Sequence, residues 1–285
     1  MVMPENKYHD VYPAIDPAGK LQGATKDFHV AITGASRGCG RCMAVAFAKA
    51  GASKLFLFGR DQKSLAETAR VTGNAGHECK IFTYSLDLSK DNVDEPFQKM
   101  LQDADGRVDV LINNAGVLET WKPLNDSDPA EWWRSFEVNI RGTYLGVKAV
   151  LPSMLKHKGG TVINLSSAGG LSTRAGASAY QTCKSDIMRF TAFLDVDHGE
   201  QGIRTFALHP GAVQTDLAFC MPEFMHKILV DTPELSGAVC VYLATKEADY
   251  LRGRYVSACW DLPQLQHRKD EILEKDLFKL RLAVD

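Results

Sequence analysis

Short apolar runs alternate with longer segments of helical periodicity along most of this chain of 285 residues. Glycine, proline, aspartate or asparagine marks each change between them. The predicted strands cover residues 28–33, 54–58, 80–85, 108–113, 161–166, 203–208 and 254–258. The predicted helices cover residues 40–50, 61–71, 89–103, 129–157, 178–198 and 233–245. This alternation predicts an α/β fold, a doubly wound, seven-stranded parallel sheet with helices on both faces.

One domain accounts for residues 26–262, because no repeat, low-complexity tract or linker interrupts them. Residues 1–25 form a polar N-terminal tail, which lacks the basic and apolar regions of a secretory signal. Residues 263–285 carry leucine and isoleucine near helical spacing. We therefore expect a C-terminal amphipathic helix that packs on the body or on another subunit.

Charge and cysteine content narrow the range of partners. The chain has 33 lysine and arginine residues against 35 aspartate and glutamate residues, which leaves no bulk attraction to nucleic acid or anionic lipid. No uninterrupted apolar run reaches the roughly 18 residues of a membrane-spanning helix. We therefore expect a cytoplasmic protein without a nucleic-acid or membrane partner. An odd number of cysteines, seven in a long chain, indicates reduced thiols.

A glycine-rich turn, TGASRGCG at residues 33–40, connects the first predicted strand to the first predicted helix. Glycine allows the backbone to turn sharply and to approach a pyrophosphate closely. The free N–H groups at the start of the helix then face the negative charge. In the first strand–helix unit of an α/β sheet, such a turn predicts a nucleotide-binding site.

Three other motifs fit parts of this turn less well. The segment from Gly34 to Gly38 satisfies the nucleophile elbow of α/β-hydrolases, but that elbow needs an upstream strand, and here only a polar tail precedes it. A phosphate loop of the NTPase kind needs Gly-Lys-Ser/Thr, whereas Gly40 is followed by arginine and cysteine. Cys39 and Cys42 lack a second ligand pair at zinc spacing, so we expect no metal site.

Tyr180 and Lys184 are four residues apart in a predicted helix and therefore share one face. A phenol with its ordinary pKa near ~10 is a poor acid–base catalyst at neutral pH, and a nearby ammonium lowers that pKa. Ser167 follows the fifth strand, at the carboxyl edge where open α/β sheets bind ligands. Its hydroxyl can donate to a substrate oxygen, while strand alternation points Ser166 the other way.

These motifs together resemble the short-chain dehydrogenase/reductase family: the glycine-rich turn, Asn-Asn-Ala-Gly at residues 113–116, Asn139, Ser167, Tyr180, Lys184, and Pro210 with Gly211. The resemblance extends from about residue 28 to residue 260 and implies a single Rossmann domain. It also implies a catalytic set. Tyr180 gives or takes the proton and Lys184 tunes it, Ser167 polarises the substrate oxygen, and Asn139 holds a water that relays protons to Lys184.

The same resemblance implies which residues bind the cofactor. They are Gly34, Ser36, Arg37, Gly38, Gly40, Arg60, Asp87, Leu88, Asn114, Ala115, Gly116, Tyr180, Lys184, Pro210, Gly211, Val213 and Thr215. Val213 and Thr215 would meet the nicotinamide carboxamide. For Asp87 there are two interpretations, contact with adenine and capping of the helix expected from residue 89. We interpret His209 as structural.

The end of the second strand favours NADP(H) over NAD(H). NAD enzymes usually place an acid there to bind the ribose hydroxyl, whereas this chain has Gly59 followed by Arg60. Arg37 adds a second guanidinium from the glycine-rich turn. Each guanidinium can donate two parallel hydrogen bonds to the oxygens of a phosphate, which favours a cofactor with an adenosine 2′-phosphate. Asp61 favours NAD(H), unless it caps the helix that follows.

Residues 216–231 are unusually apolar for a surface connection. The resemblance places a substrate-covering loop here, and its Met and Phe side chains suit a hydrophobic small-molecule substrate. The alternative is packing against the C-terminal helix.

We expect an NADPH-dependent, reversible reduction of a ketone or aldehyde to an alcohol, in a homodimer or homotetramer. Imine or enone reduction, epimerisation and a non-catalytic NADP(H) sensor are the alternatives.

Overall fold

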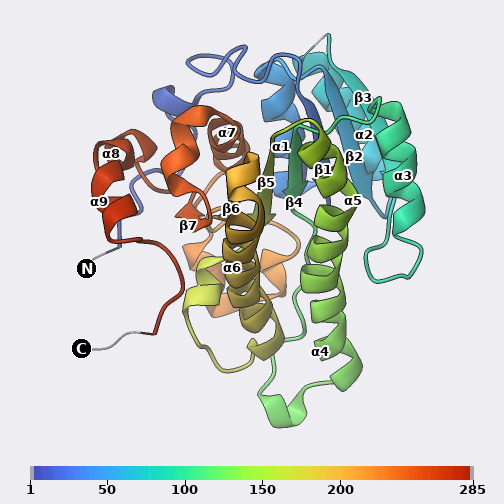
Figure 1. Ribbon diagram of the computed structural model, residues 1–285. Helices are drawn as coiled ribbons and strands as arrows, with labels where there is room; N and C mark the ends of the chain where they lie inside the picture. Colours follow the sequence, from blue (N-terminus) through green and yellow to red (C-terminus); the bar gives the residue numbers. More distant parts are fainter. Residues whose placement is uncertain (1–2, 77, 283–285) are drawn as a thin grey trace.

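A computed structural model describes residues 3–76 and 78–282 (Figure 1). Seven parallel strands form one sheet in the order β3-β2-β1-β4-β5-β6-β7. The strands are β1 (His29–Thr33), β2 (Lys54–Gly59), β3 (Lys80–Ser85), β4 (Val110–Asn113), β5 (Gly160–Leu165), β6 (Ile203–His209) and β7 (Arg254–Ser257). Every predicted strand is present, and no end is displaced by more than two residues.

Helices cover both faces of the sheet. One face carries α1 (Gly38–Lys49), α2 (Gln62–Ala75) and α7 (Pro233–Ala244), and the other carries α3 (Asp94–Asp103), α5 (Gly142–Lys156) and α6 (Ser178–His198). Successive strand residues enter opposite cores: Val30 and Ile32 join the first core, and Ala31 joins the second. The predicted doubly wound Rossmann domain is confirmed.

The strand order reverses next to β1, because β2 lies on one side of it and β4 on the other. The connections after β1 and β4 therefore leave the sheet on opposite faces and open a crevice at its carboxyl edge. Ligands of open α/β sheets bind at such a point.

The helix predicted over residues 129–157 is not continuous. It consists of α4 (Pro129–Phe136), a π-helical turn at Glu137–Arg141, and α5. Asp128 caps α4, since its carboxylate accepts a hydrogen bond from the Glu131 N–H at 2.8 Å. A π turn inserts one extra residue, and such turns occur frequently at functional sites. Asn139 lies inside this one.

Residues 3–27 are packed on the domain, although the sequence suggests a polar tail. Tyr12, Ile15 and Leu21 are buried in the first core. The Lys7 and Tyr8 N–H groups both donate to the carbonyl of Cys259. These apolar residues are widely spaced and follow no helical or strand period, so the sequence pattern does not reveal their burial.

The C-terminal segment differs from the single helix expected over residues 263–285. It forms α8 (Leu262–His267) and α9 (Lys269–Glu274), and residues 275–282 continue without a helix. Asp276 and Phe278 adopt left-handed backbone with φ of 47° and 62°, which cannot continue an α-helix. Asp276 is held by an ion pair with Arg254 at 2.7 Å. Residues 283–285 lie outside the described part of the chain.

Within that part, no helix is both long enough and apolar enough to cross a bilayer.

Candidate active site

A cleft of about 900 Å³ opens at the carboxyl edge of the sheet, where the strand order reverses. Most of the predicted site residues line it: Gly34, Ser36, Arg37, Gly38, Gly40, Arg60, Asp87, Leu88, Asn114, Ala115, Gly116, Tyr180, Lys184, Pro210 and Thr215. Four predicted site residues are not among those that line it: Asn139, Ser167, Gly211 and Val213. A volume of this size lies within the range of small-molecule and cofactor sites.

The glycine-rich turn requires glycine at particular positions. Gly34 and Gly38 have φ of 65° and 53°, which residues with a side chain rarely adopt. A Cβ on Gly34 would stand 2.8 Å from the Ala115 Cα, and a Cβ on Gly40 would press on the Gly34 carbonyl. The close packing leaves the first residues of α1 in the cleft wall, where helix N–H groups bind anions.

The segment after β4 braces this turn. The Asn114 amide donates to the carbonyls of Thr33 and Gly34, both at 3.0 Å. The Ala115 N–H donates to the Thr33 hydroxyl at 3.1 Å. Asn114 and Ala115, which are predicted to contact the cofactor, therefore also fix the shape of the glycine-rich turn.

At the end of β2, Asp61 faces its own helix. Its carboxylate accepts hydrogen bonds from the Lys63 and Ser64 N–H groups at 3.1 and 3.3 Å, so it caps α2 as the sequence allows. A hydrogen bond from the Ser64 hydroxyl, more than any other contact, holds the pKa of Asp61 below its ordinary value. Arg60 is exposed and lines the cleft, with Gly59 before it and no acid at that position.

Asp87 also turns back on the chain. Its carboxylate accepts hydrogen bonds from the N–H and the hydroxyl of Ser89, at 3.0 and 2.7 Å. These bonds close a turn, and α3 begins only at Asp94, so the predicted helix start at residue 89 is wrong. Asp87 therefore does not act as the helix cap that the sequence suggests as an alternative, and it lines the cleft.

An ion pair crosses the cleft wall between two exposed side chains. The Arg37 guanidinium, from the glycine-rich turn, lies 2.6 Å from the Asp216 carboxylate. Asp216 begins the apolar connection 216–231. Exposed pairs of this kind contribute only about 0–1 kcal/mol, so a phosphate can compete for the same guanidinium.

Tyr180 and Lys184 share one face of α6, as predicted. The Lys184 Nζ lies 5.5 Å from the centre of the Tyr180 ring and donates to the Leu165 carbonyl at 2.6 Å. Burial lowers the pKa of Lys184 to about 8. Burial also raises the pKa of Tyr180 to about 12, and the largest opposing effect is a hydrogen bond with Ser167. Lys184 is not among the largest effects on the pKa of Tyr180 in this structure.

Strand alternation distinguishes the two serines correctly. The buried Ser166 hydroxyl donates to the Lys184 carbonyl at 2.7 Å and so supports the backbone of α6. Ser167 Oγ accepts from the Gly169 N–H at 3.0 Å, so the two serine hydroxyls have different partners.

Asn139 is completely buried in the π turn. Its amide donates to the carbonyls of Ser135 and Val117, at 2.8 and 2.9 Å, and its oxygen accepts from the Val117 N–H at 3.3 Å. A Cβ on Gly116 would stand 2.8 Å from that oxygen and 3.7 Å from the Lys184 Nζ. Gly116 therefore lies between the Asn139 side chain and the lysine and leaves room for both.

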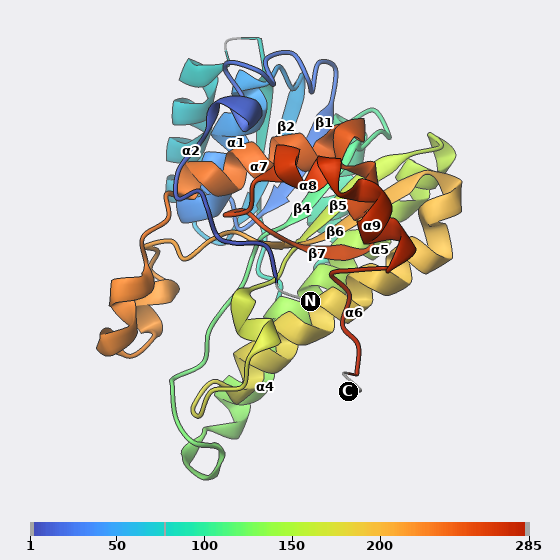
Figure 2. The same cartoon turned by 90° about the vertical axis from the view of Figure 1, so that its left-hand side faces the viewer.

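The connection 216–231 projects away from the C-terminal helices (Figure 2). It contains two short 3₁₀ helices, Ala218–Cys220 and Glu223–Ile228. Leu217 lines the cleft, Met225 is buried, and Phe224 is 71% exposed. Packing against α8 and α9, the alternative that the sequence leaves open, is therefore not observed.

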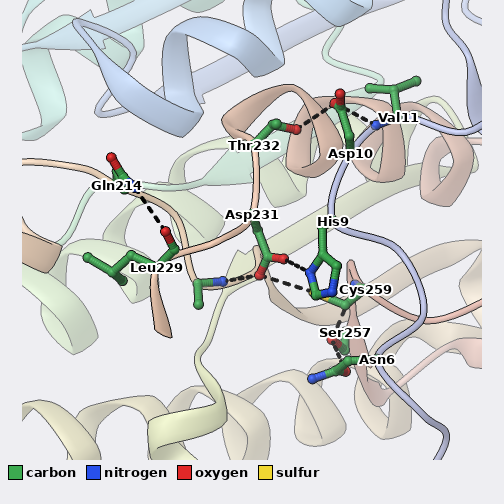
Figure 3. A network of polar contacts seen from close by, with 11 residues as sticks. Asn6, His9, Asp10, Val11, Gln214, Leu229, Asp231, Thr232, Ser257 and Cys259 are labelled. Atoms are coloured by element: carbon green, nitrogen blue, oxygen red, sulfur yellow. Dashed lines mark hydrogen bonds and ion pairs between the residues drawn. The ribbon is translucent and has the colours of Figure 1, made fainter. Parts of the chain in front are cut away.

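A polar network fixes the far end of this connection (Figure 3). The Asp231 carboxylate is buried and pairs with the His9 ring, while the Ala212 N–H and the Cys259 thiol donate to it. The Thr232 N–H donates to the His9 carbonyl at 2.8 Å. His9 and Asp231 are 222 residues apart in the chain, so no local sequence pattern reveals this pair. The N-terminal segment therefore holds the end of the connection.

His209 is buried and lies close enough to Asp231 to feel its charge. Burial lowers the pKa of His209 to about 4, so its imidazole is neutral near neutral pH. Val213 pairs with Asp231 in a short parallel bridge, and Gly211 has φ of 98°. These residues shape the segment after β6.

All seven cysteines are free thiols. In residues 3–76 and 78–282, no group of three or more His, Cys, Asp or Glu side chains is arranged to hold a metal ion.

Known proteins resemble this chain over most of its length. The family model described as short chain dehydrogenase matches residues 28–223. The short chain dehydrogenase mpl6 of Monascus purpureus is 43% identical over 280 residues, which is 97% of this chain and 95% of the relative. The short chain dehydrogenase andI of Emericella variicolor is 35% identical, over 98% of this chain and 96% of the relative.

Solved structures resemble it as well. A short chain dehydrogenase from Shigella flexneri, complexed with NADP, has a TM-score of 0.76 and 25% identity, and the match covers 83% of this chain and 99% of that one. Levodione reductase has a TM-score of 0.76 and 27% identity, over 81% of this chain and 96% of that one.

Proposed function

Because this chain belongs to the short-chain dehydrogenase family of oxidoreductases, we propose that it uses NADP(H) to reduce a ketone or aldehyde of a hydrophobic small molecule to the alcohol, reversibly. One observation carries the proposal: Tyr180, with Lys184 on the same helix face, lines a cleft that also holds the glycine-rich turn. The turn, the start of α1 in the cleft wall and the volume of the cleft all fit a dinucleotide.

The phenol is the proton donor in this proposal. With its pKa raised to about 12, Tyr180 is protonated near neutral pH, which is the state that reduction requires. The Ser167 hydroxyl can bind the same substrate oxygen and stabilise the negative charge that develops there. When bound, the cofactor supplies the hydride. The Lys184 Nζ lies 5.5 Å from the centre of the Tyr180 ring, and the Asn139 side chain lies near Lys184 at Gly116, so we assign the replacement of the phenol proton to these two residues.

Two arginines support NADP(H) as the cofactor. Arg60 follows β2 without an acid before it, and Arg37 extends from the glycine-rich turn. The Shigella flexneri relative is described as complexed with NADP. A hydrogen bond to a charged group contributes about 1.5–3 kcal/mol, so Arg60→Asp should weaken NADPH binding about 10- to 100-fold and leave NADH binding nearly unchanged.

A matched substitution controls for the change in surface charge. Arg70→Asp reverses the charge of an exposed arginine in α2, which pairs with Glu67 rather than with the cleft. It should change neither dissociation constant. Equal losses of NADPH and NADH binding in Arg60→Asp would show that this arginine does not bind the adenosine 2′-phosphate, which only NADPH carries.

The apolar connection 216–231 supports a hydrophobic substrate, because its Leu217 lines the cleft and Phe219 is exposed nearby in the chain.

We also propose that residues 26–262 form the catalytic domain, that the protein is cytoplasmic, and that it is a homodimer or homotetramer. Analytical ultracentrifugation tests the subunit number.

The decisive experiment measures NADPH consumption against a panel of hydrophobic ketones, aldehydes and cyclic imines. Tyr180→Phe should abolish turnover of the best substrate and leave NADPH binding intact. Unchanged turnover in that variant would refute the assigned proton donor. Activity on cyclic imines alone would show that the substrate is an imine rather than a ketone or aldehyde.

A further inference from the structure

Helix α6 carries Tyr180 in its first turn but has no cap of its own. The residue before it, Ala177, offers no side-chain acceptor. The first N–H groups of any helix lack partners within the helix, and those of Ala179 and Tyr180 are among them. A helix that begins inside the protein needs an acceptor from elsewhere.

Glu119 is that acceptor. One carboxylate oxygen accepts from the Ala179 N–H at 2.9 Å and from the Tyr180 N–H at 3.1 Å. The other accepts from the Tyr180 N–H at 3.0 Å. Glu119 is only 5% exposed, although it precedes α6 in the chain by about sixty residues. The partial positive charge of a helix N-terminus favours a carboxylate at this place.

The same short segment also holds Asn139. Val117 binds the Asn139 side chain through both its N–H and its carbonyl. The Ser135 hydroxyl donates to Glu119 at 3.5 Å, and the Ser135 carbonyl accepts from the Asn139 amide. Residues 117–119 therefore connect the π turn to the first turn of α6.

We propose that Glu119 is a positioning residue, which sets the place of the Tyr180 phenol by holding the backbone of Ala179 and Tyr180. Its effect on turnover rests on the proposed function. Lys184 is held independently, because its Nζ donates to Leu165 and its carbonyl accepts from Ser166. Loss of Glu119 therefore displaces the phenol more than the lysine or the glycine-rich turn.

The test compares Glu119→Ala with Glu119→Gln, which keeps one oxygen for the two N–H groups. Hydrogen–deuterium exchange of residues 178–181 reports the anchoring and needs no substrate. Because a misplacement of about 1 Å can cost on the order of a hundredfold in rate, we expect Glu119→Ala to lower kcat about 10- to 100-fold. The KM and the NADPH dissociation constant should stay within about threefold, because Lys184 and the glycine-rich turn are held by other contacts. Glu119→Gln should recover most of the rate and the slow exchange.

Asp261→Ala is the matched control. Asp261 caps α8 through the Gln264 N–H at 3.1 Å and does not line the cleft. The Asp261→Ala substitution also removes a carboxylate that accepts from the N–H groups at the start of a helix, and it should leave kcat unchanged. If Glu119→Ala does not fold, Glu119→Asp replaces it, because its carboxylate falls one methylene short of the two N–H groups.

Unchanged kcat in a variant whose first α6 turn exchanges faster would overturn the proposal, as would a fall in kcat without faster exchange. A parallel loss of NADPH binding would do the same, because it indicates general disruption of the site. A wild-type protein that reduces no carbonyl counts against the proposed function, and the exchange rates then decide the anchoring alone.

Discussion

Replacing Gly40 with alanine adds one methyl group at the tightest point of the glycine-rich turn. The new Cβ would stand 2.6 Å from the Asn114 Nδ2 and 3.0 Å from the Ala35 Cα, and closer still to the Gly34 carbonyl. That carbonyl is itself held by the Asn114 amide. Ordinary contact begins at 3.4 Å, so the start of α1 must move by at least 0.8 Å, the difference between 3.4 and 2.6 Å.

The displacement affects binding more than folding. Overpacking costs about 1–3 kcal/mol, but alanine stabilises a helix by about 1 kcal/mol relative to glycine, so the free energy of unfolding should fall by no more than about 2 kcal/mol. A preorganised site that shifts by about 1 Å loses on the order of a hundredfold. We therefore expect the NADPH dissociation constant to rise about 100-fold, or roughly 2.7 kcal/mol.

Gly73→Ala provides the matched control. Gly73 lies in α2, and the nearest atom to its added Cβ is the Ile81 Cδ1 at 3.8 Å. This substitution should stabilise the protein by about 1 kcal/mol and leave NADPH binding unchanged. Fluorescence titration with NADPH and urea unfolding of both variants give the two quantities. A folded Gly40→Ala protein with the wild-type dissociation constant would refute the steric argument.

Two further perturbations follow from buried charges. Burial lowers the pKa of Lys184 to about 8, so from there up to 10.5 the unfolded chain holds a proton that the folded chain lacks. The free energy of unfolding therefore rises with pH in that window. Urea unfolding should show that the difference in this free energy between wild type and Lys184→Met grows by up to about 3 kcal/mol. A difference that does not change with pH would contradict this reasoning. His9→Ala leaves the buried Asp231 with fewer partners, costs roughly 1–3 kcal/mol, and should speed proteolytic cleavage within residues 216–231. Unchanged cleavage would contradict the anchoring role of His9.

The arrangement of strands was predictable because burial on both faces leaves a direct trace in the sequence. β4 is an unbroken apolar run apart from its last residue, and every residue of it is buried. The choice of Ser167 over Ser166 rested on strand alternation and on its spacing to Tyr180. Local, periodic patterns therefore predicted the sheet and its carboxyl edge, and the family resemblance supplied most of the residues that gather there.

Features without a local pattern were missed. The π turn around Asn139 inserts a single residue, which leaves the helical period on either side intact. The raised pKa of Tyr180 comes from desolvation, which depends on neighbours from several elements. Glu119 is a lone acid in a loop, and its one trace in the sequence is Ala177, a poor cap at the start of a predicted helix.

The two ends of the connection 216–231 are attached to the domain by contacts of unequal strength. Asp231 is tied by His9, Ala212 and Cys259 in a buried network, whereas Asp216 is held at its side chain by Arg37 in solvent. Movement of this segment should therefore pivot about Asp231 and open at the Asp216 end. Any anion that competes for the Arg37 guanidinium would therefore free the Asp216 end of the segment and leave the Asp231 end in place.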